Sequence, residues 1–161
     1  MNNYKKIILV LAGVLITGGA LFAWKTTANQ QDTPNDNNSE LVLATVYKSP
    51  TCGCCVKHSA YLKDNGFAVQ IEKTDDMSAV KAEHQIPQNM ESCHTTVIGD
   101  YFIEGHVPIE AIEKLLTEKP DIDGIALPDM PAGSPGMPGI KTRPFEIFSI
   151  KDGQTAKYLS I

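Results

Sequence analysis

Three of the four cysteines of this 161-residue chain fall within four positions, in the run Cys52-Gly53-Cys54-Cys55. The run holds a C-x-C, an adjacent pair and a C-x-x-C, and it stands where a predicted strand gives way to a predicted helix. The free N–H groups and the dipole at a helix N-terminus lower thiol pKa values, and the thiolate is the form that binds metals or attacks disulfides. The spacing therefore predicts reactive sulfur at this junction.

Two other interpretations of these cysteines are structural disulfides and redox exchange. Neither Cys52 with Cys54 nor Cys54 with Cys55 closes a disulfide without strain, and a bridge from Cys52 to Cys55 encloses too short a loop to stabilise the fold much. The same C-x-x-C pair is typical of thiol-disulfide exchange, in which Cys52 attacks and Cys55 resolves. Metal binding is therefore favoured, redox exchange is the second interpretation, and purely structural disulfides are the third.

The rest of the chain supplies the elements that must position these sulfurs. From alternation, apolar stripes and capping residues we expect strands at 41–47, 67–71, 95–98 and 101–104 and helices at 54–65, 76–85 and 108–118. This β-α-β-α-β-β-α order is the thioredoxin-like α/β order, with the cysteine run between the first strand and the first helix. A Pro/Gly/Met-rich segment follows at 128–139, and strands at 145–150 and 155–161 predict a C-terminal β-hairpin.

Cys93 lies just before the strand expected at 95–98. In the thioredoxin-like arrangement this loop packs beside the N-terminus of the first helix, so we expect a fourth sulfur to meet the other three. A pocket of four thiolates selects a soft ion, either Cu(I) or, in tetrahedral geometry, Zn. Adjacent and one-apart cysteines suit low coordination numbers and bridging sulfur, which favours Cu(I), bound singly or as a multinuclear cluster.

Three further residues are candidate copper ligands. His94 follows the fourth cysteine, although a ring at the start of a strand can also point away from the other sulfurs. His106 precedes the helix expected at 108–118 and is either a ligand or a group that caps the helix or supports a ligand. Met137 lies among prolines and glycines, where its thioether can bind Cu(I) without losing a proton or can pack the loop onto the domain.

Other catalytic patterns do not stand out in the sequence. It shows no Ser-His-Asp arrangement, paired carboxylates or glycine-rich phosphate loop between a strand and a helix. His58, one helical turn from Cys54, is expected to be an ordinary surface histidine. Apart from the alternative redox pair we predict no catalytic residue, and a metal-binding protein is favoured over an enzyme.

The N-terminal part of the chain predicts export. The stretch 7–24 is apolar and follows Lys5 and Lys6, a charge asymmetry that keeps the N-terminus in the cytoplasm and sends the remainder to the periplasm. The expected order along the chain is a signal peptide or N-terminal membrane anchor at 1–28, a disordered linker at 29–40, a thioredoxin-like metal-binding domain at 41–120 and a C-terminal extension packed on that domain at 121–161.

Three motifs in order resemble those of a known family. The segments are YKSPTCGCC, SCHTTVIGDYFIEGHVP and ALPDMPAGSPGMPG, and together they span roughly residues 41 to 140. They are similar to the CopG-type periplasmic proteins of copper-resistance operons, which are described as predicted metal-binding proteins. The resemblance implies a thioredoxin-like fold, a Cu(I) cluster held by the four matching cysteines, and copper handling or copper redox chemistry in the periplasm.

These observations favour an extracytoplasmic Cu(I)-binding protein of copper homeostasis or resistance. Its expected partners are copper ions and copper-exporting or other copper-handling proteins, with the membrane contacted only through the N-terminal segment. The acidic balance, a net charge of −5, argues against nucleic acid. The alternative is a thioredoxin-like thiol-disulfide oxidoreductase, or one whose exchange is coupled to copper. The expected metal ligands are Cys52, Cys54, Cys55 and Cys93, with His94, His106 and Met137 in addition.

Overall fold

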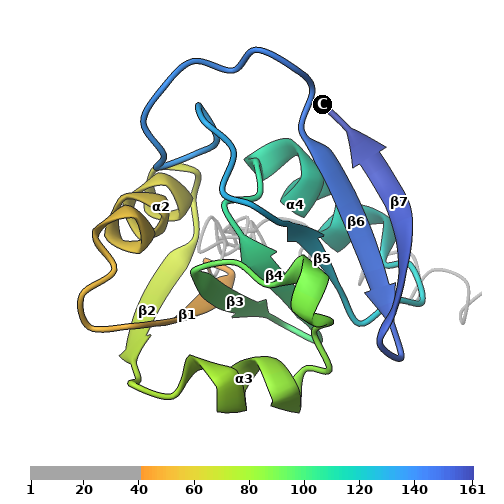
Figure 1. The fold of residues 1–161 in the computed structure, drawn as a ribbon, viewed down its shortest axis with the longest axis horizontal. Helices are drawn as coiled ribbons and strands as arrows, with labels where there is room; N and C mark the ends of the chain where they lie inside the picture. Colours follow the sequence, from red (N-terminus) through yellow and green to blue (C-terminus); the bar gives the residue numbers. More distant parts are fainter. Residues whose placement is uncertain (1–40) are drawn as a thin grey trace, which may run out of the picture. The chain divides into compact units, whose positions relative to one another are not determined.

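Residues 41–161 are described by a computed structural model, in which seven strands form one sheet with helices on both of its faces (Figure 1). The strand order across the sheet is β2-β1-β3-β4-β5-β6-β7. In chain order the elements are β1 (Leu43–Lys48), α2 (Gly53–Asp64), β2 (Ala68–Lys73), α3 (Met77–Glu83), the short 3-10 helix η1 (Gln88–Met90), β3 (His94–Ile98), β4 (Tyr101–Gly105), α4 (Ile109–Glu118), β5 (Gly124–Leu127), β6 (Glu146–Lys151) and β7 (Gln154–Ser160).

The N-terminal expectations concern residues outside this description. The signal peptide or anchor at 1–28 and the linker at 29–40 both fall there. Within residues 41–161, no helix is both long and apolar enough to cross a bilayer.

Helix α2 is fixed at both ends by its own sequence. The sulfur of Cys52 occupies the N-cap position and accepts a hydrogen bond from the Cys55 N–H at 3.3 Å. At the other end Gly66 follows the C-cap residue with a φ of 87°, a left-handed conformation that glycine adopts without steric cost. The helix therefore starts at the cysteine run and ends before the turn into β2.

Alternation along the central strands divides the core between the two faces of the sheet. In β4, Ile103 belongs to the larger apolar cluster, which includes Leu62 of α2 and Ile112 of α4. Its neighbour Phe102 belongs to a second cluster on the other face, together with Ile86, which follows α3. Burying a side chain of this size contributes about 1.5–3 kcal/mol. Apolar burial thus holds α2 and α4 on one face of the sheet.

The expected α/β class is confirmed, and the sheet contains one strand that the sequence pattern does not predict. β5 is four residues long, is buried along its whole length and runs parallel to β4. So short an apolar run, placed between Pro120 and a proline-rich segment, has too few residues to show a strand period. Because β6 and β7 continue the sheet from β5, the residues after 120 supply three of its seven strands.

A buried ion pair anchors the loop that carries Cys93. The Lys81 ammonium of α3 contacts Oε1 of Glu104 in β4, and neither side chain is more than 6% exposed. The same carboxylate accepts hydrogen bonds from the Ser92 N–H at 2.5 Å and from the Thr95 hydroxyl at 2.6 Å. Glu104 thus holds the chain on both sides of Cys93.

We predict that Glu104→Leu lowers the free energy of unfolding by about 3–5 kcal/mol, because it leaves the Lys81 charge buried without a partner. The double variant Lys81→Met/Glu104→Leu should recover part of that loss. Urea unfolding of the variants measures both changes. Lys114→Ala, which removes the exposed Lys114–Glu118 pair, is the matched control and should leave the free energy of unfolding almost unchanged. Equal losses in the single and double variants would refute the charge argument.

Candidate metal and redox centre

A tight turn brings β1 into α2. The Cys52 N–H donates to the Ser49 carbonyl at 3.1 Å. Lys48, the buried last residue of β1, donates its ammonium to the same carbonyl at 2.7 Å. Strand β3 pairs with β1 in antiparallel fashion and places His94 opposite Lys48. The sheet register therefore delivers Cys93, which immediately precedes β3, to the start of the helix.

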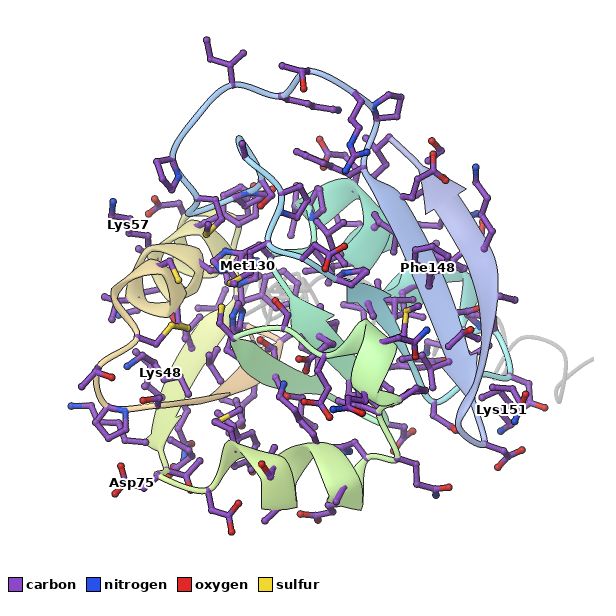
Figure 2. All side chains as sticks on the ribbon, in the orientation of Figure 1. Lys48, Lys57, Asp75, Met130, Phe148 and Lys151 are labelled. Atoms are coloured by element: carbon purple, nitrogen blue, oxygen red, sulfur yellow. A yellow bond between two sulfur atoms is a disulfide. The ribbon has the colours of Figure 1, made fainter. Side chains whose placement is uncertain are left out.

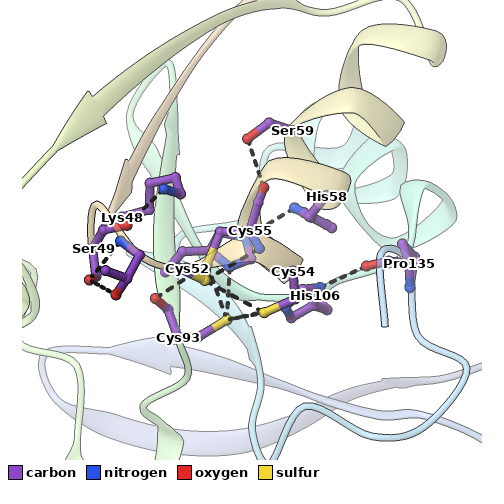
Figure 3. The surroundings of a disulfide bond; sticks show 12 residues. Lys48, Ser49, Cys52, Cys54, Cys55, His58, Ser59, Cys93, His106 and Pro135 are labelled. Atoms are coloured by element: carbon purple, nitrogen blue, oxygen red, sulfur yellow. Dashed lines mark hydrogen bonds between the residues drawn. A yellow bond between two sulfur atoms is a disulfide. The ribbon is translucent and has the colours of Figure 1, made fainter. Parts of the chain in front are cut away.

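The four cysteine sulfurs converge at this point (Figure 3). Cys52 and Cys55 are joined by a disulfide, with their Cα atoms 5.5 Å apart. Cys54 Sγ lies 3.5 Å from Cys52 Sγ. Cys93 Sγ lies 3.5 Å from Cys55 Sγ and 3.8 Å from Cys54 Sγ. All four sulfurs lie within 4.8 Å of one another, so the fold brings Cys93 to the three cysteines of the run, as its place before the third strand predicts.

The disulfide joins the two cysteines that form the alternative redox pair, and its sulfur–sulfur bond is visible beside the start of α2 in Figure 2. Among the described residues, Cys54 and Cys93 are the free thiols. Cys52 is partly exposed, whereas Cys55 is fully buried. A thiol of another molecule can therefore approach the Cys52 sulfur but not the Cys55 sulfur.

Burial is the main influence on the pKa of the Cys93 thiol. Burial, and after it the proximity of Cys54, raises the pKa of the Cys93 thiol to about 12. The expectation of lowered thiol pKa values applies to the helix N-terminus, whereas Cys93 reaches the cluster from the loop before β3. This thiol keeps its proton at neutral pH, and a metal that binds there must displace it.

Three fully buried histidines form a group beside the Cys93 thiol, and two of them contact it. The distances from Cys93 Sγ are 3.4 Å to Nδ1 of His94 and 3.1 Å to Nε2 of His106. Behind them, His58 Nδ1 lies 3.0 Å from His94 Nε2. The expectation that His58 is a surface residue is wrong, because its side of α2 packs on His94 and on the backbone at Val107 rather than facing water.

Two backbone carbonyls determine which ring nitrogens carry hydrogen. A carbonyl oxygen only accepts hydrogen bonds, so His58 Nε2 donates to the Val107 oxygen at 3.2 Å. For the same reason His106 Nδ1 donates to the Pro135 oxygen at 2.7 Å. A neutral imidazole has one N–H, so His58 Nδ1 must accept the N–H of His94 Nε2. Nδ1 of His94 and Nε2 of His106 therefore both present lone pairs to the buried thiol.

Burial also keeps these rings uncharged. It lowers the pKa of His58 to about 4, the hydrogen bond to Val107 notwithstanding, and it lowers the pKa of His94 well below the ordinary value. Burial lowers the pKa of His106 as well. Cys93, His94 and His106 thus form a second group of potential metal ligands, whose donor atoms lie within 4.8 Å of one another. Sulfur and neutral imidazole are the donors that copper and zinc prefer.

The Pro/Gly/Met-rich loop closes over this group. At Gly136 the backbone has a φ of 84°, and a Cβ there would stand 2.7 Å from the His58 backbone nitrogen, so only glycine allows the loop to touch α2. The preceding residue, Pro135, supplies the carbonyl for His106. Met137, which follows Gly136, is partly buried, whereas Met130 is 37% exposed.

Sequence reasoning missed two contributors to the centre. His58 stands three residues after Cys55, a helical spacing that places both on one side of α2 and is the signal that predicts a buried ring. The role of the Pro135 carbonyl cannot be predicted from residue types, because every residue has a backbone oxygen.

Comparison with known proteins adds a functional context. Two solved structures of copper resistance protein CopG, in forms 2 and 1, match the chain with TM-scores of 0.70 and 0.68. They are 40% and 39% identical to it, and the matches cover 76% of this chain and 99% and 98% of theirs. A family model described as protein of unknown function, DUF411, matches residues 90–137, the part that carries Cys93, His94 and His106. No curated protein matches significantly.

We predict that stability falls as the pH drops from about 6.5 to about 4. The folded His58 has a pKa of about 4, while an unfolded histidine titrates near ~6.5, so only the unfolded chain binds the proton in that range. The contribution is fully present above pH ~6.5, and its loss amounts to about 3 kcal/mol. Urea unfolding across this pH range measures it.

Two variants control that measurement. His58→Gln removes the buried ring and should make the pH dependence shallower. His84→Gln removes a partly exposed histidine outside the buried group and should leave it unchanged. If His58→Gln keeps the full wild-type slope, the assignment to this ring is wrong.

Proposed function

We propose that this chain, which belongs to the CopG family of copper resistance proteins, binds Cu(I) through Cys52, Cys54, Cys55 and Cys93 and thereby contributes to copper handling. The convergence of the four sulfurs within 4.8 Å carries this proposal. Soft thiolates select Cu(I) over the hard cations, and neither ligand group contains a carboxylate. Zn remains the alternative ion, because four thiolates also suit its tetrahedral geometry.

Copper capacity depends on the redox state of the centre. Four thiolates become available only after the Cys52–Cys55 disulfide gains two electrons, whereas the oxidised chain offers Cys54 and Cys93 alone. His94 and His106 are proposed as additional ligands, supported by the lone pairs that they direct at Cys93. Met137 is proposed as a further ligand, supported by its place in the loop that covers α2.

We also propose where the protein acts. The apolar stretch at 7–24 behind two lysines supports export to the periplasm, by a leader that is cleaved or kept as an anchor. The order of elements from β1 to α4 supports the thioredoxin-like comparison. In the periplasm the domain lowers the free copper concentration and passes the ion to copper-exporting proteins.

Anaerobic titration of the reduced full-length protein with Cu(I), against a chromophoric chelator, tests the leading function. We expect sulfur-to-copper charge-transfer absorption and saturation at a fixed stoichiometry. Cys93→Ser should lower the stoichiometry or weaken binding by at least about tenfold, the effect of removing a single ligand contribution of 1.4 kcal/mol or more. Ser149→Ala, on β6 with its hydroxyl directed to the Ala156 carbonyl, is the control and should bind as the wild type does.

Two further arms make the titration decisive. Protein left in the disulfide form should bind less Cu(I) than the reduced protein. If reduced protein instead takes up Zn and Cu(I) fails to displace it, the copper proposal is wrong and a zinc site replaces it.

Thiol-disulfide exchange is the second candidate, and the Cys52–Cys55 disulfide at the N-terminus of α2 is the observation that favours it. The partly exposed Cys52 is suited to attack, and the buried Cys55 to resolve the mixed disulfide. Coupling of this exchange to bound copper would join the two functions.

Turnover of an insulin or fluorescent disulfide reporter by the reduced protein tests the second candidate. Cys52→Ser should abolish turnover, and Cys55→Ser should accumulate a mixed disulfide at Cys52, because the resolving thiol is gone. Cys93→Ser should retain turnover. A wild-type rate no faster than that of Cys52→Ser would remove this function.

A further inference from the structure

The free thiol of Cys93 lies against a disulfide to which it does not belong. Its sulfur is 3.5 Å from Cys55 Sγ, so the two sulfur atoms are already in van der Waals contact. Cys55 is fully buried, so a thiol from another molecule has no access to it. A nucleophile within the protein is therefore the one placed to react at this sulfur.

We propose that Cys93 exchanges with the Cys52–Cys55 disulfide, so that the oxidised protein holds its disulfide in two alternative places, Cys52–Cys55 and Cys55–Cys93. Cys93 sulfur attacks Cys55 Sγ and forms the new S–S bond. The Cys52–Cys55 bond breaks, and its electron pair leaves on Cys52 Sγ. The proton of the Cys93 thiol moves to Nε2 of His106 as the new bond forms and is returned to the released Cys52 thiolate, so His106 is uncharged again when the exchange is complete. No oxidant or reductant is consumed.

The hydrogen-bond network selects His106 as the proton acceptor. Its Nδ1–H is committed to the Pro135 carbonyl at 2.7 Å, so its Nε2 lone pair faces Cys93 Sγ at 3.1 Å. Nδ1 of His94 also presents a lone pair but is farther away, at 3.4 Å. An acceptor is required because a thiol attacks disulfides only as the thiolate.

The helix terminus selects Cys52 as the leaving group. Its sulfur accepts the Cys55 N–H at the N-cap of α2, and the free N–H groups and dipole there stabilise a thiolate. A stabilised thiolate is the better leaving group in disulfide exchange. The other free thiol, Cys54, lies 3.5 Å from Cys52 Sγ, but its attack would form a strained bridge across a single residue.

The exchange changes which sulfurs are free. With the disulfide at Cys52–Cys55 the thiols are Cys54 and Cys93, whereas with the disulfide at Cys55–Cys93 they are Cys52 and Cys54. The second pair is partly exposed at the start of α2 and forms a C-x-C. An oxidised chain would then present the thiols of Cys52 and Cys54 to a soft ion or to the disulfide of a partner protein. This inference goes beyond the proposed copper function and requires no metal.

Disulfide mapping of the full-length protein tests the exchange. The protein carrying one disulfide is equilibrated at pH 8 with a metal chelator, quenched in acid, alkylated and digested with trypsin. Cleavage after Lys48 and Lys57 leaves three cysteines in peptide 49–57, and Cys93 falls in peptide 82–114. We expect both a looped peptide 49–57 and a cross-link between the two peptides, assigned by fragmentation to Cys55.

Variants separate the steps of the exchange. Cys93→Ser should lose the cross-link, and Cys52→Ser should form only the cross-link on mild oxidation. The cross-link should persist in Cys54→Ser. His106→Asn keeps a donor for Pro135 but lacks the Nε2 acceptor, so the cross-link should appear at least about tenfold more slowly. His84→Asn, the same substitution at a histidine outside the buried group, is the matched control for rate.

Three outcomes would overturn the proposal. They are a wild-type protein that contains only the looped peptide, a cross-link that maps to Cys54, and a Cys52→Ser protein that forms no cross-link. The first outcome is measured on the wild-type protein, so the proposal can be refuted even if a variant misfolds. Because the chelator removes copper throughout, failure of the copper function and failure of the exchange give different results.

Discussion

The carbonyl groups of Val107 and Pro135 control the chemistry around Cys93, because they fix the hydrogen positions of three buried imidazoles. Each oxygen takes one N–H, and the opposite nitrogen of the ring is left with a lone pair. The Val107 carbonyl acts through His58 on His94, and the Pro135 carbonyl acts on His106. As a result Nδ1 of His94 and Nε2 of His106 both direct a lone pair at the Cys93 thiol. Burial holds the proton on that sulfur, and the two lone pairs give the proton an acceptor when a metal or an exchange reaction displaces it.

Copper binding and disulfide formation draw on the same sulfurs and therefore oppose each other. A ligand that binds only one state of a protein stabilises that state. In our proposal Cu(I) binds the four thiolates, so bound copper favours the dithiol form of Cys52 and Cys55 and makes their oxidation less favourable. Conversely, oxidation removes two donors and weakens the hold on the ion. One group of residues thereby links the copper load to the redox state of its surroundings.

Local sequence patterns predict the parts of this molecule whose causes are local. Caps, alternation and apolar stripes place β1 to α4 within a few residues, and the spacing of the cysteine run indicates reactive sulfur. What they miss depends on tertiary contacts. β5 is too short to show a period and is a strand because β4 and β6 flank it. His58 is buried against His94 and the Val107 carbonyl, which come from distant parts of the chain, and the role of Pro135 is carried by an oxygen that every residue has.

The position of β5 has a consequence for the C-terminal third of the chain. The loop that supplies Pro135 leaves the sheet at β5 and returns to it at β6, and the main chain of Phe145 bonds to that of Ile161 in both directions. The last residues of the chain thus fix the far end of the loop that crosses the sulfur centre. A protein that ended before Phe145 would keep every cysteine and histidine, yet the loop would be held at β5 alone and His106 would lose the orientation that the Pro135 carbonyl gives it.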